Sequence, residues 1–462
     1  MKKIVFLITS MLFLVTNLSA KDSDYMDKIV KLWTLKTNKV IEFNTTKVDD
    51  GYNLIISSKN PYYKELFSTK PIKIRVDEGP IITTPHFTLG TAGLMATGSI
   101  LDILNPKIVK DIKTKVKHIP KYKYEATVSF GNEYESEFEV EPFAIKDKDI
   151  EVEISKITSK SDYDLDTFTG KESIKIDKVL VEPKKEEGKL SLKDIDIKTE
   201  SLQEPIDDIM LFMKSNFSIK EVILNFKERG KSINTKFSAS FRGNSIRVDR
   251  ELLDFDMGYD FKALDEKTIA LAKGIKESSL DLALKKLGIN GVVEFIKLSK
   301  ELEEANNNLI EATQKGDDAA MQKAILATQD ISNKIVPIWN KTLIANKSKI
   351  ILDLELKSDK TSYVKLDLTY KGKPLSGNVQ SAMISLMAQQ LGIFDGKFDI
   401  AVDSTLATSI NPFALMGLDL LKAKGFVDVK NGVYYLKGEL KGGKIIIKGK
   451  AYTLPELTKA LF

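Results

Sequence analysis

Hydrophobic and polar residues alternate along much of the chain between about residues 37 and 263. The clearest case is "SINTKFSASFR", residues 232–242, whose odd positions hold Ile, Thr, Phe, Ala and Phe while its even positions are polar. Because successive side chains of a strand point to opposite faces, this period of two predicts a strand with one buried and one solvated face. "YKYEATVSF", "SEFEVEPF", "SIKIDKVLV" and "KLSLKDIDIK" show the same alternation and predict further strands.

Residues 264–346 carry their hydrophobic positions at helical spacing instead. We expect a helical hairpin here, with a break between Gly288 and Gly291. The second helix is expected to begin near Asp317, an N-cap candidate, and to be kinked by Pro337.

Strands resume after the hairpin, in "KIILDLELKS" and "YVKLDLTYKG". Two amphipathic helices are expected near residues 376–391 and 411–424, followed by a short β meander. Its first turn is predicted at Asn431-Gly432, a pair that favours the type I′ turn of hairpins, and its second at Gly442-Gly443.

These patterns predict an α+β fold, rich in β structure. It would contain one or more long, one-faced antiparallel sheets, an inserted helical hairpin and a C-terminal helix-plus-meander region. The expected organisation is an export segment over 1–20, a β-rich region over 21–263, the hairpin over 264–346 and an α/β region over 347–462. The apolar face of so long a sheet must be covered by something.

The first 20 residues have the composition of an export signal. Met1-Lys2-Lys3 is followed by an uncharged, largely apolar run of 15 residues, Ile4 to Leu18, and cleavage is expected after Ala20. The run is shorter than the roughly 20 residues of a spanning helix. We therefore expect an exported protein, with a retained N-terminal anchor as the alternative to a cleaved signal.

Composition narrows the function classes. The 70 basic residues are nearly balanced by 65 acidic ones, and only five of the basic residues are Arg. Nucleic-acid readers favour the Arg fork, so Lys intermixed with Asp and Glu is read as a solvated surface, and no nucleic-acid partner is expected. The lack of cysteine excludes disulfides, thiolate metal sites and a Cys nucleophile.

One stretch nearly spells a phosphate-binding loop. In "GELKGGKIIIKGKA", Gly438, Gly443 and Lys444 fit the template, but Ile445 stands where a Ser or Thr must ligate magnesium. The β-branched residues that follow favour a strand, whereas a phosphate loop leads into a helix. We therefore interpret the glycines as turn residues.

Other candidate chemistry is equally incomplete. Asp162, Asp164 and Asp166 open like a calcium loop, but the later ligand positions are not filled, so we expect an acidic turn or edge before a strand. The two histidines, His86 and His118, belong to no zinc or catalytic-triad motif. We expect no catalytic residue, no cofactor and no metal.

Residues 77–104 are poor in charge and rich in Gly, Thr and Ala. Two interpretations are open: an apolar loop that contacts a ligand or a membrane, or a buried connection with a short helix. For the first, the candidate contact residues are Ile81, Ile82, Phe87, Leu89, Leu94 and Met95.

With these residues in view, the chain resembles the YdgA-like family of bacterial envelope proteins. The likeness rests on the N-terminal segment, on Glu78-Gly79-Pro80 where members show His-Gly-Pro, and on the C-terminal "LLKAKGFVDVKNGVYYLKGELKGGKIIIKGKAY". The resemblance implies a periplasmic location beside the inner membrane, self-association, and no known catalytic residues.

The leading hypothesis is a non-catalytic envelope protein that acts as a periplasmic structural or protein-interaction scaffold at the inner membrane. The alternative is a protein that binds or transfers lipid or another apolar ligand on an apolar sheet face. An envelope hydrolase is the least supported. Partners would accordingly be other envelope proteins, a second copy of the chain, or lipid. A filled apolar face would favour the scaffold, and an open one would favour lipid.

Overall fold

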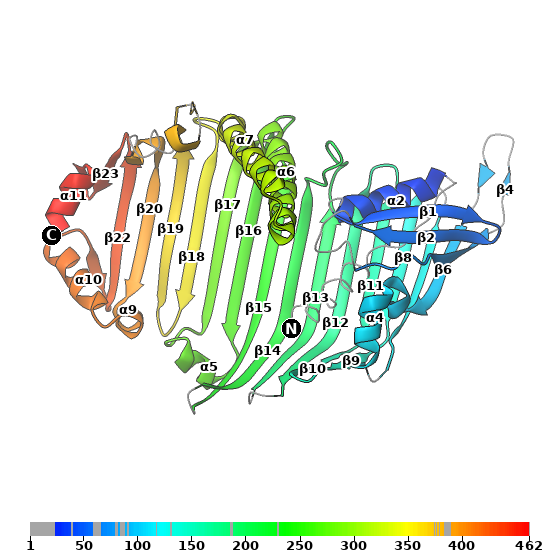
Figure 1. Ribbon diagram of the computed structural model, residues 1–462. Coiled ribbons are helices and arrows are strands. Elements are labelled where there is room, and N and C mark those ends of the chain that lie inside the picture. The colour runs from blue at the N-terminus through cyan, green and yellow to red at the C-terminus, as the bar shows by residue number, and fades with distance from the viewer. Residues whose placement is uncertain are drawn as a thin grey trace. The chain divides into compact units, whose positions relative to one another are not determined.

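The chain folds into two compact units, unit 1 (Met1–Asn234) and unit 2 (Thr235–Phe462). A computed structural model describes residues 24–37, 40–58, 66–78, 82–83, 88–89, 92–116, 118–129, 132–184, 188–228, 231–373, 375, 377, 379–382 and 390–461. The expected fold class is confirmed: the protein is β-rich, with a long antiparallel sheet and with helices at the C-terminus (Figure 1).

Unit 1 contains three described helices and most of the shorter strands. The helices are α2 (Asp24–Lys36), α3 (Ile100–Ile103) and α4 (Pro106–Lys113). The strands are β1 (Glu42–Val48), β2 (Gly51–Ser57), β3 (Ile72–Glu78), β4 (Ile82–Thr83), β5 (Thr88–Leu89), β6 (Ala92–Ser99), β7 (Lys121–Val128), β8 (Glu133–Val140), β9 (Phe143–Lys146), β10 (Ile150–Ile154), β11 (Ile157–Asp164), β12 (Thr169–Pro183), β13 (Gly188–Ser201) and β14 (Met213–Glu228).

The sheet of unit 1 is antiparallel throughout, in the order β1-β2-β3-β6-β7-β8-β11-β12-β13-β14. β9 and β10 pair with each other, and β10 continues along the far half of β12. The strands expected from "YKYEATVSF", "SEFEVEPF", "SIKIDKVLV" and "KLSLKDIDIK" are confirmed as β7, β8, β12 and β13.

The apolar face of this sheet is filled from within the unit. α2 lies against the sheet (Figure 1), and Trp33 in its last turn is only 1% exposed. The Trp33 ring meets Phe43, Tyr124 and Tyr134 edge-on, at centroid distances of 6.1, 6.1 and 6.3 Å. Met26, Ile29, Leu32 and Leu35 of the same helix are also buried in this core. Unit 1 therefore has an ordinary two-layer core.

A buried ion pair fixes the end of α2 to the sheet. Lys36 Nζ lies 3.1 Å from a carboxylate oxygen of Glu172 on β12, and the two side chains are only 8% and 7% exposed. The Nζ also lies 4.3 Å from the centre of the Tyr163 ring. Burial lowers the pKa of Lys36, but the charge of Glu172 and the neighbouring tyrosines outweigh it, so the pKa of Lys36 is raised.

Unit 2 consists of long strands and the larger helices. The strands are β15 (Lys231–Arg247, most of which lies in unit 2), β16 (Leu252–Ala263), β17 (Glu277–Gly288), β18 (Lys349–Lys357), β19 (Thr361–Tyr370), β20 (Phe394–Asp403), β21 (Asp428–Lys430), β22 (Val433–Lys441), β23 (Lys444–Ile447) and β24 (Lys450–Tyr452). The helices are α5 (Glu266–Leu271), α6 (Ile289–Lys315), α7 (Asp318–Thr342), the short 3-10 helix η1 (Gln390–Ile393), α9 (Ser404–Ile410), α10 (Ala414–Ala423) and α11 (Leu454–Leu461).

The strands of unit 2 form an antiparallel sheet in which most neighbours follow each other in the chain. The order is β15-β16-β17-β18-β19-β20-β22, and the far edge of β22 carries β21 and β23, with β24 next to β23. The long alternating stretch at residues 232–242 is confirmed as part of β15.

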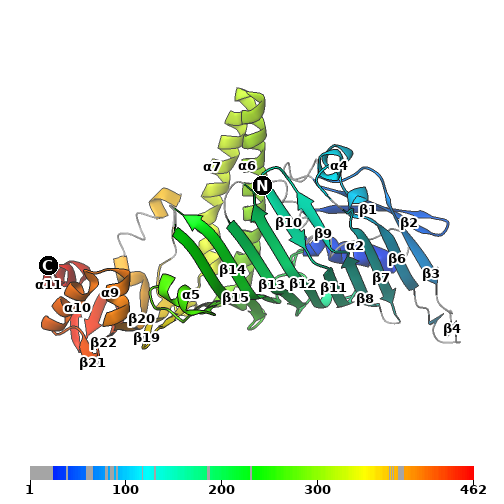
Figure 2. The same cartoon turned by 90° about the horizontal axis from the view of Figure 1, so that it is seen from below.

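The helical hairpin is confirmed as α6 and α7, but it begins at Ile289 and not at residue 264. The two helices pack on each other through Leu298, Ala305, Ile331 and Ile338, and Figure 2 shows the pair projecting away from the sheet. The Asp317 side chain accepts a hydrogen bond from the Ala320 amide, which confirms the expected N-cap.

The helix expected over residues 264–288 is wrong: this segment forms α5 and then strand β17. Leu280, Leu284 and Leu287 are spaced as on one side of a helix, but Leu280, Leu282 and Leu284 also alternate as in a strand. Pairing with β16 on one side and β18 on the other decides between the two patterns. Strand β20 was likewise not expected.

The end of the chain follows the expected meander. Asn431 and Gly432 have φ of 52° and 74°, and Gly442 and Gly443 have φ of 56° and 79°, so both turns use the left-handed region that type I′ turns require. Lys444 begins strand β23, which confirms the turn interpretation of the phosphate-loop-like stretch. Of the two expected helices, the second is α10. Of the first, residues 379–382 are described as helix, and residues 390 and 391 belong to the short η1.

Candidate functional site on the sheet of unit 2

The register of the unit 2 sheet places apolar side chains opposite each other across many strands. The middle row contains Met257, Leu282, Leu352, Leu366, Phe398, Gly438 and Ile447. A second row contains Tyr259, Leu280, Leu354, Val364, Ile400 and Leu436, and a third Phe255, Leu284, Ile350, Leu368, Gly396, Leu440 and Ile445. We call the side of the sheet formed by these three rows the apolar face.

The opposite side of the same strands is charged. The row Asp281, Asp353, Lys365, Asp399 and Lys437 crosses β17 to β22. The strict alternation of residue type along each strand is what separates these two faces. We call this side the charged face.

The middle of the apolar face is open. Leu280 is 38% exposed and Tyr259 42%, close to the 49% of the Asp281 side chain on the charged face. Every residue of β18 except the exposed Lys357 is half-buried, whichever face it belongs to. Similar exposure on both sides means that this part of the sheet is a single layer, whereas α2 covers the equivalent face in unit 1.

In the described part of the chain, helices cover the apolar face at the C-terminal end of the sheet. Leu415, Leu418 and Leu421 of α10 pack with Phe398 and Leu436 of the apolar face. Leu457 of α11 belongs to the same cluster. So do Tyr434 of β22, Ile445 and Ile447 of β23, and Tyr452 of β24. Among the described residues, the apolar face is therefore covered near β22 to β24 and open over β16 to β19.

Two adjoining cavities lie where the covered part meets the open part. One, of about 400 Å³, is lined by Val402, Ala407 and residues of α10: Ala414, Gly417, Leu418, Leu420 and Leu421. The other, of about 130 Å³, shares Val402 and Ala407 and extends to Leu354, Leu356 and Val364 of β18 and β19. Nearly all of the lining is aliphatic, so this space fits hydrocarbon better than a polar molecule.

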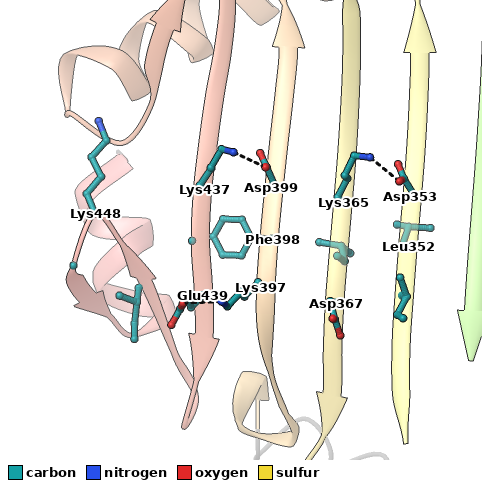
Figure 3. Close-up of a pocket in the computed structure, with 15 residues that line it drawn as sticks. Leu352, Asp353, Lys365, Asp367, Lys397, Phe398, Asp399, Lys437, Glu439 and Lys448 are labelled. Atoms are coloured by element: carbon teal, nitrogen blue, oxygen red, sulfur yellow. Dashed lines mark hydrogen bonds and ion pairs between the residues drawn. The ribbon is translucent and has the colours of Figure 1, made fainter. Parts of the chain in front are cut away.

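The charged face carries a wider hollow of about 690 Å³. Its four lysines, Lys365, Lys397, Lys437 and Lys448, are matched by four acidic residues, Asp353, Asp367, Asp399 and Glu439. In Figure 3, Lys365 pairs with Asp353 and Lys437 with Asp399, each at 2.7 Å. These hydrogen bonds raise the pKa of Lys365 and Lys437, so both remain charged and paired. This balanced ladder offers neither a general base nor a net charge to hold a ligand.

The candidate contact residues from the sequence do not form one site among the described residues. Ile81 and Phe87 lie outside the described residues, and the backbones of Ile82 and Leu89 pair between β4 and β5. Leu94 is 1% exposed within the core of unit 1, so it cannot contact a ligand or membrane from the surface, whereas Met95 is 43% exposed. Residues 92–99 form strand β6, and Ile100, Leu101 and Ile103 of the short helix α3 that follows are buried.

The histidines and the aspartates also lie apart. His86 is outside the described residues, and His118 is exposed, with its Nε2 3.2 Å from a Glu141 oxygen. The backbone amide of Lys121, and then His118, hold the pKa of Glu141 below its usual value. Asp164 caps the turn after β11, and Asp166 bonds Lys28 and Asn132. Within the described ranges, no group of three or more acidic or histidine side chains is placed to hold a metal ion.

Sequence reasoning found part of the apolar face and missed the rest. The alternating apolar residues of β18 and β19 are predicted from the sequence, but those of β17 and β20 are not. The signal was present in "SLDLAL" and "KFDIAV", which alternate over six residues. In the sequence of α10, no pattern distinguishes the apolar residues that point outward from the leucines that point to the sheet.

Comparison with protein families assigns the chain to a family. A family model described as "Bacterial protein of unknown function (DUF945)" matches residues 68–455. The chain belongs to the DUF945 family. The DUF945 match includes every strand of the unit 2 sheet and therefore the whole apolar face, whereas α2, β1 and β2 lie before it. No curated protein and no solved structure matches the chain significantly. None of the helices in the described part is both long and apolar enough to cross a membrane.

Proposed function

We propose that this DUF945 protein is a non-catalytic, YdgA-like protein of the bacterial envelope whose unit 2 sheet binds the acyl chains of a lipid. The observation that carries the proposal is the single-layer apolar face with its adjoining aliphatic cavities. A monomer in water rarely exposes so large a continuous apolar surface unless something binds there.

The dimensions of the apolar face suit an acyl chain. The open part of a row, from β16 to β19, crosses three inter-strand steps of about 4.8 Å, or about 14 Å. A lipid chain occupies half of a hydrocarbon core that is roughly 30 Å thick, or about 15 Å. The open part of one row therefore nearly matches the length of an acyl chain, and the adjoining cavities extend it.

The chemistry of the face selects for hydrocarbon. The middle row presents Met257, Leu282, Leu352 and Leu366, none of which can donate or accept a strong hydrogen bond. Burial of an acyl chain contributes about 0.8 kcal/mol for each CH₂ removed from water. A polar ligand would lose its hydration on this face without replacement bonds.

The N-terminus supports a place in the envelope. Residues 1–20 have the charge and hydrophobicity of a signal peptide or short anchor. We propose that the two folded units are in the periplasm, next to the inner membrane, where acyl lipids are the abundant apolar molecules.

A second candidate function is that of a protein-interaction scaffold, with a second copy or another envelope protein on the apolar face. The open part of the face, about 14 Å across the strands and nine residues of about 3.3 Å along them, measures about 430 Å², so a protein partner would also have to cover the neighbouring exposed side of α10. Each partner of a standard protein interface contributes about 800 Å².

One experiment separates the two functions. The chain from Lys21 onward, which keeps every described residue, is purified from an envelope fraction without detergent. Bound molecules are then extracted with organic solvent and identified by mass spectrometry, and the same sample is sized by sedimentation. We expect stoichiometric phospholipid or fatty acid on a monomer.

A lipid-free dimer that also fails to take up a fluorescent fatty acid would contradict lipid binding and support the scaffold. A fluorescent fatty acid that binds at one or two sites for each chain, and is displaced by palmitate, would support the proposed function.

A further inference from the structure

The corner formed by α9 and α10 exposes the most prominent apolar side chains of unit 2. Phe413 is 74% exposed and Met416 71%, the two highest values for large hydrophobic side chains among the described residues. Ile410, at the end of α9, is 58% exposed. Such side chains contribute nothing to the core, so their position calls for another explanation.

α10 has two apolar sides. Its inward side holds Leu415, Leu418 and Leu421 against the sheet. Phe413, Met416 and Leu420 follow each other at intervals of three and four residues on another side, which is exposed. A helix that is apolar around most of its circumference is buried or lies in a membrane interface, and α10 has no fully buried residue.

The charges around the exposed side favour an anionic surface. Lys424 follows Leu420 by four residues and continues the same side, and it is exposed. The only acidic residue of α10, Asp419, accepts a 2.5 Å hydrogen bond from Tyr434 on β22. Lys273, which is also exposed, adjoins α9, because its carbonyl accepts a 3.0 Å hydrogen bond from Ser409 Oγ.

The aliphatic cavity lies directly beneath this corner. Gly417 and Leu420 of α10 belong to its lining, and Val402 and Ala407 connect it to the second cavity on the apolar face. An acyl chain that enters beside α10 would therefore pass from the corner to the open part of the sheet without meeting a charged side chain in either lining.

We infer that the α9–α10 corner docks on a lipid bilayer that contains anionic lipids, inserts Phe413 and Met416 among the lipids, and admits an acyl chain into the cavity beneath. The docking step stands on the corner itself, whereas the admission of an acyl chain rests on the proposed function of the apolar face. Insertion of two large side chains together with neighbouring lysines is typical of interfacial membrane binding.

The test places a reporter at the corner. In the chain from Lys21 onward, Phe413→Trp is mixed with vesicles of phosphatidylcholine and phosphatidylglycerol, with and without brominated acyl chains. We expect a blue shift and quenching of the added Trp signal, relative to the parent chain, whose tryptophans are Trp33 and Trp339. Unchanged emission on vesicles that contain phosphatidylglycerol would overturn docking.

Matched variants separate docking from ligand binding. Phe413→Ser with Met416→Ser should lower vesicle partitioning at least about tenfold, because the apolar area inserted into the bilayer is lost. Leu326→Ser on α7, a side chain that is 60% exposed, should leave partitioning unchanged. If both variants lose vesicle partitioning equally, the α9–α10 corner is not the part of the protein that contacts the membrane.

A titration with a soluble fluorescent fatty acid tests the proposed function independently. The Phe413 and Met416 double variant should bind this probe as the parent does while it fails to bind vesicles. Vesicle binding that persists in the double variant would overturn the inference even if the probe binds. A dimer of the parent that dissociates in the double variant, with no vesicle binding by either, would assign the corner to a second copy and overturn membrane docking.

Discussion

The ring of Phe398 on β20 lies over Gly438 of β22, its direct cross-strand neighbour on the apolar face. A Cβ at Gly438 would stand 2.3 Å from Cζ of this ring and 2.6 Å from the carbonyl oxygen of Ile446 on β23. Gly438 is the first glycine of the stretch that resembles a phosphate loop. Its role is to let an aromatic ring lie flat against the sheet between α10 and the open face.

Gly438→Ala should therefore destabilise unit 2. The added methyl must displace the Phe398 ring and part of β23, and overpacking of this kind costs about 1–3 kcal/mol. The expected result is faster hydrogen exchange in peptides from β20 and β22 at low urea, measured by mass spectrometry. Gly417→Ala is the control, since nothing lies within 4 Å of a Cβ at that position and alanine favours the helix. Equal exchange in Gly438→Ala and the parent would refute the steric argument.

The ion pair between Lys36 and Glu172 leads to a second prediction. Glu172→Gln leaves the ammonium group of Lys36 buried without its counter-charge, and loss of one partner of a buried pair costs about 3–5 kcal/mol. Unit 1 should unfold at lower urea concentration, followed by the fluorescence of the buried Trp33 in a Trp339→Phe background.

The exposed pair between Lys28 and Asp166 provides the control, because it also joins α2 to the turn between β11 and β12. The Asp166 side chain is 53% exposed, so water screens this pair, and Asp166→Asn should leave the urea midpoint nearly unchanged. If the two substitutions shift the midpoint equally, burial is not what makes the Lys36 pair important.

Alkaline pH should weaken unit 1 through Tyr122. Burial, with a smaller contribution from the charge of Asp102, raises the pKa of Tyr122 to about 12 from an ordinary value of 10.0. The folded state holds the proton more tightly, so the stabilisation is complete below pH 10 and is lost as the pH rises towards 12. With about 1.4 kcal/mol per pKa unit, Tyr122 accounts for about 3 kcal/mol of this loss.

Tyr122→Phe removes the ionisable hydroxyl and keeps the ring that stacks on Phe138. In the same Trp33 assay, the free energy of unfolding of this variant should fall less between pH 10 and 12 than that of the parent. Parallel pH profiles for the two proteins would show that Tyr122 does not titrate differently in the folded state.

Much of the architecture could be predicted because it follows from local pattern. Alternation identified β15, β18 and β19, and the turn residues Asn431 and Gly442 identified the meander. β17 was misassigned because its leucines satisfy the helical and the strand period at once, and only its neighbours β16 and β18 decide. Local pattern has no information about pairing over such distances.

The candidate site could be predicted less well for the same reason. Leu282 and Leu366 lie in one row, with only Leu352 between them, although the hairpin separates them in the chain. Whether anything covers that row depends on where α6, α7 and α10 pack. The candidates in residues 77–104 were chosen for low charge, and low charge marks a buried connection as readily as an exposed contact, as Leu94 and Ile100 show.

The apolar face itself is tested by exchanging one side chain on each side of the sheet. Leu352→Gln puts an amide in the middle row of the apolar face, between Leu282 and Leu366. A bound acyl chain would lose the contact area of one leucine and would leave the amide without hydration, so affinity for a fluorescent fatty acid should fall about tenfold or more.

Lys365→Gln introduces the same amide on the charged face, where Lys365 pairs with Asp353, and should bind the probe as the parent does. Because Leu352 is already half-exposed, the fold should tolerate the change, and far-ultraviolet circular dichroism of both variants should match the parent. Equal affinities in the two variants would show that the fatty acid does not bind on the apolar face.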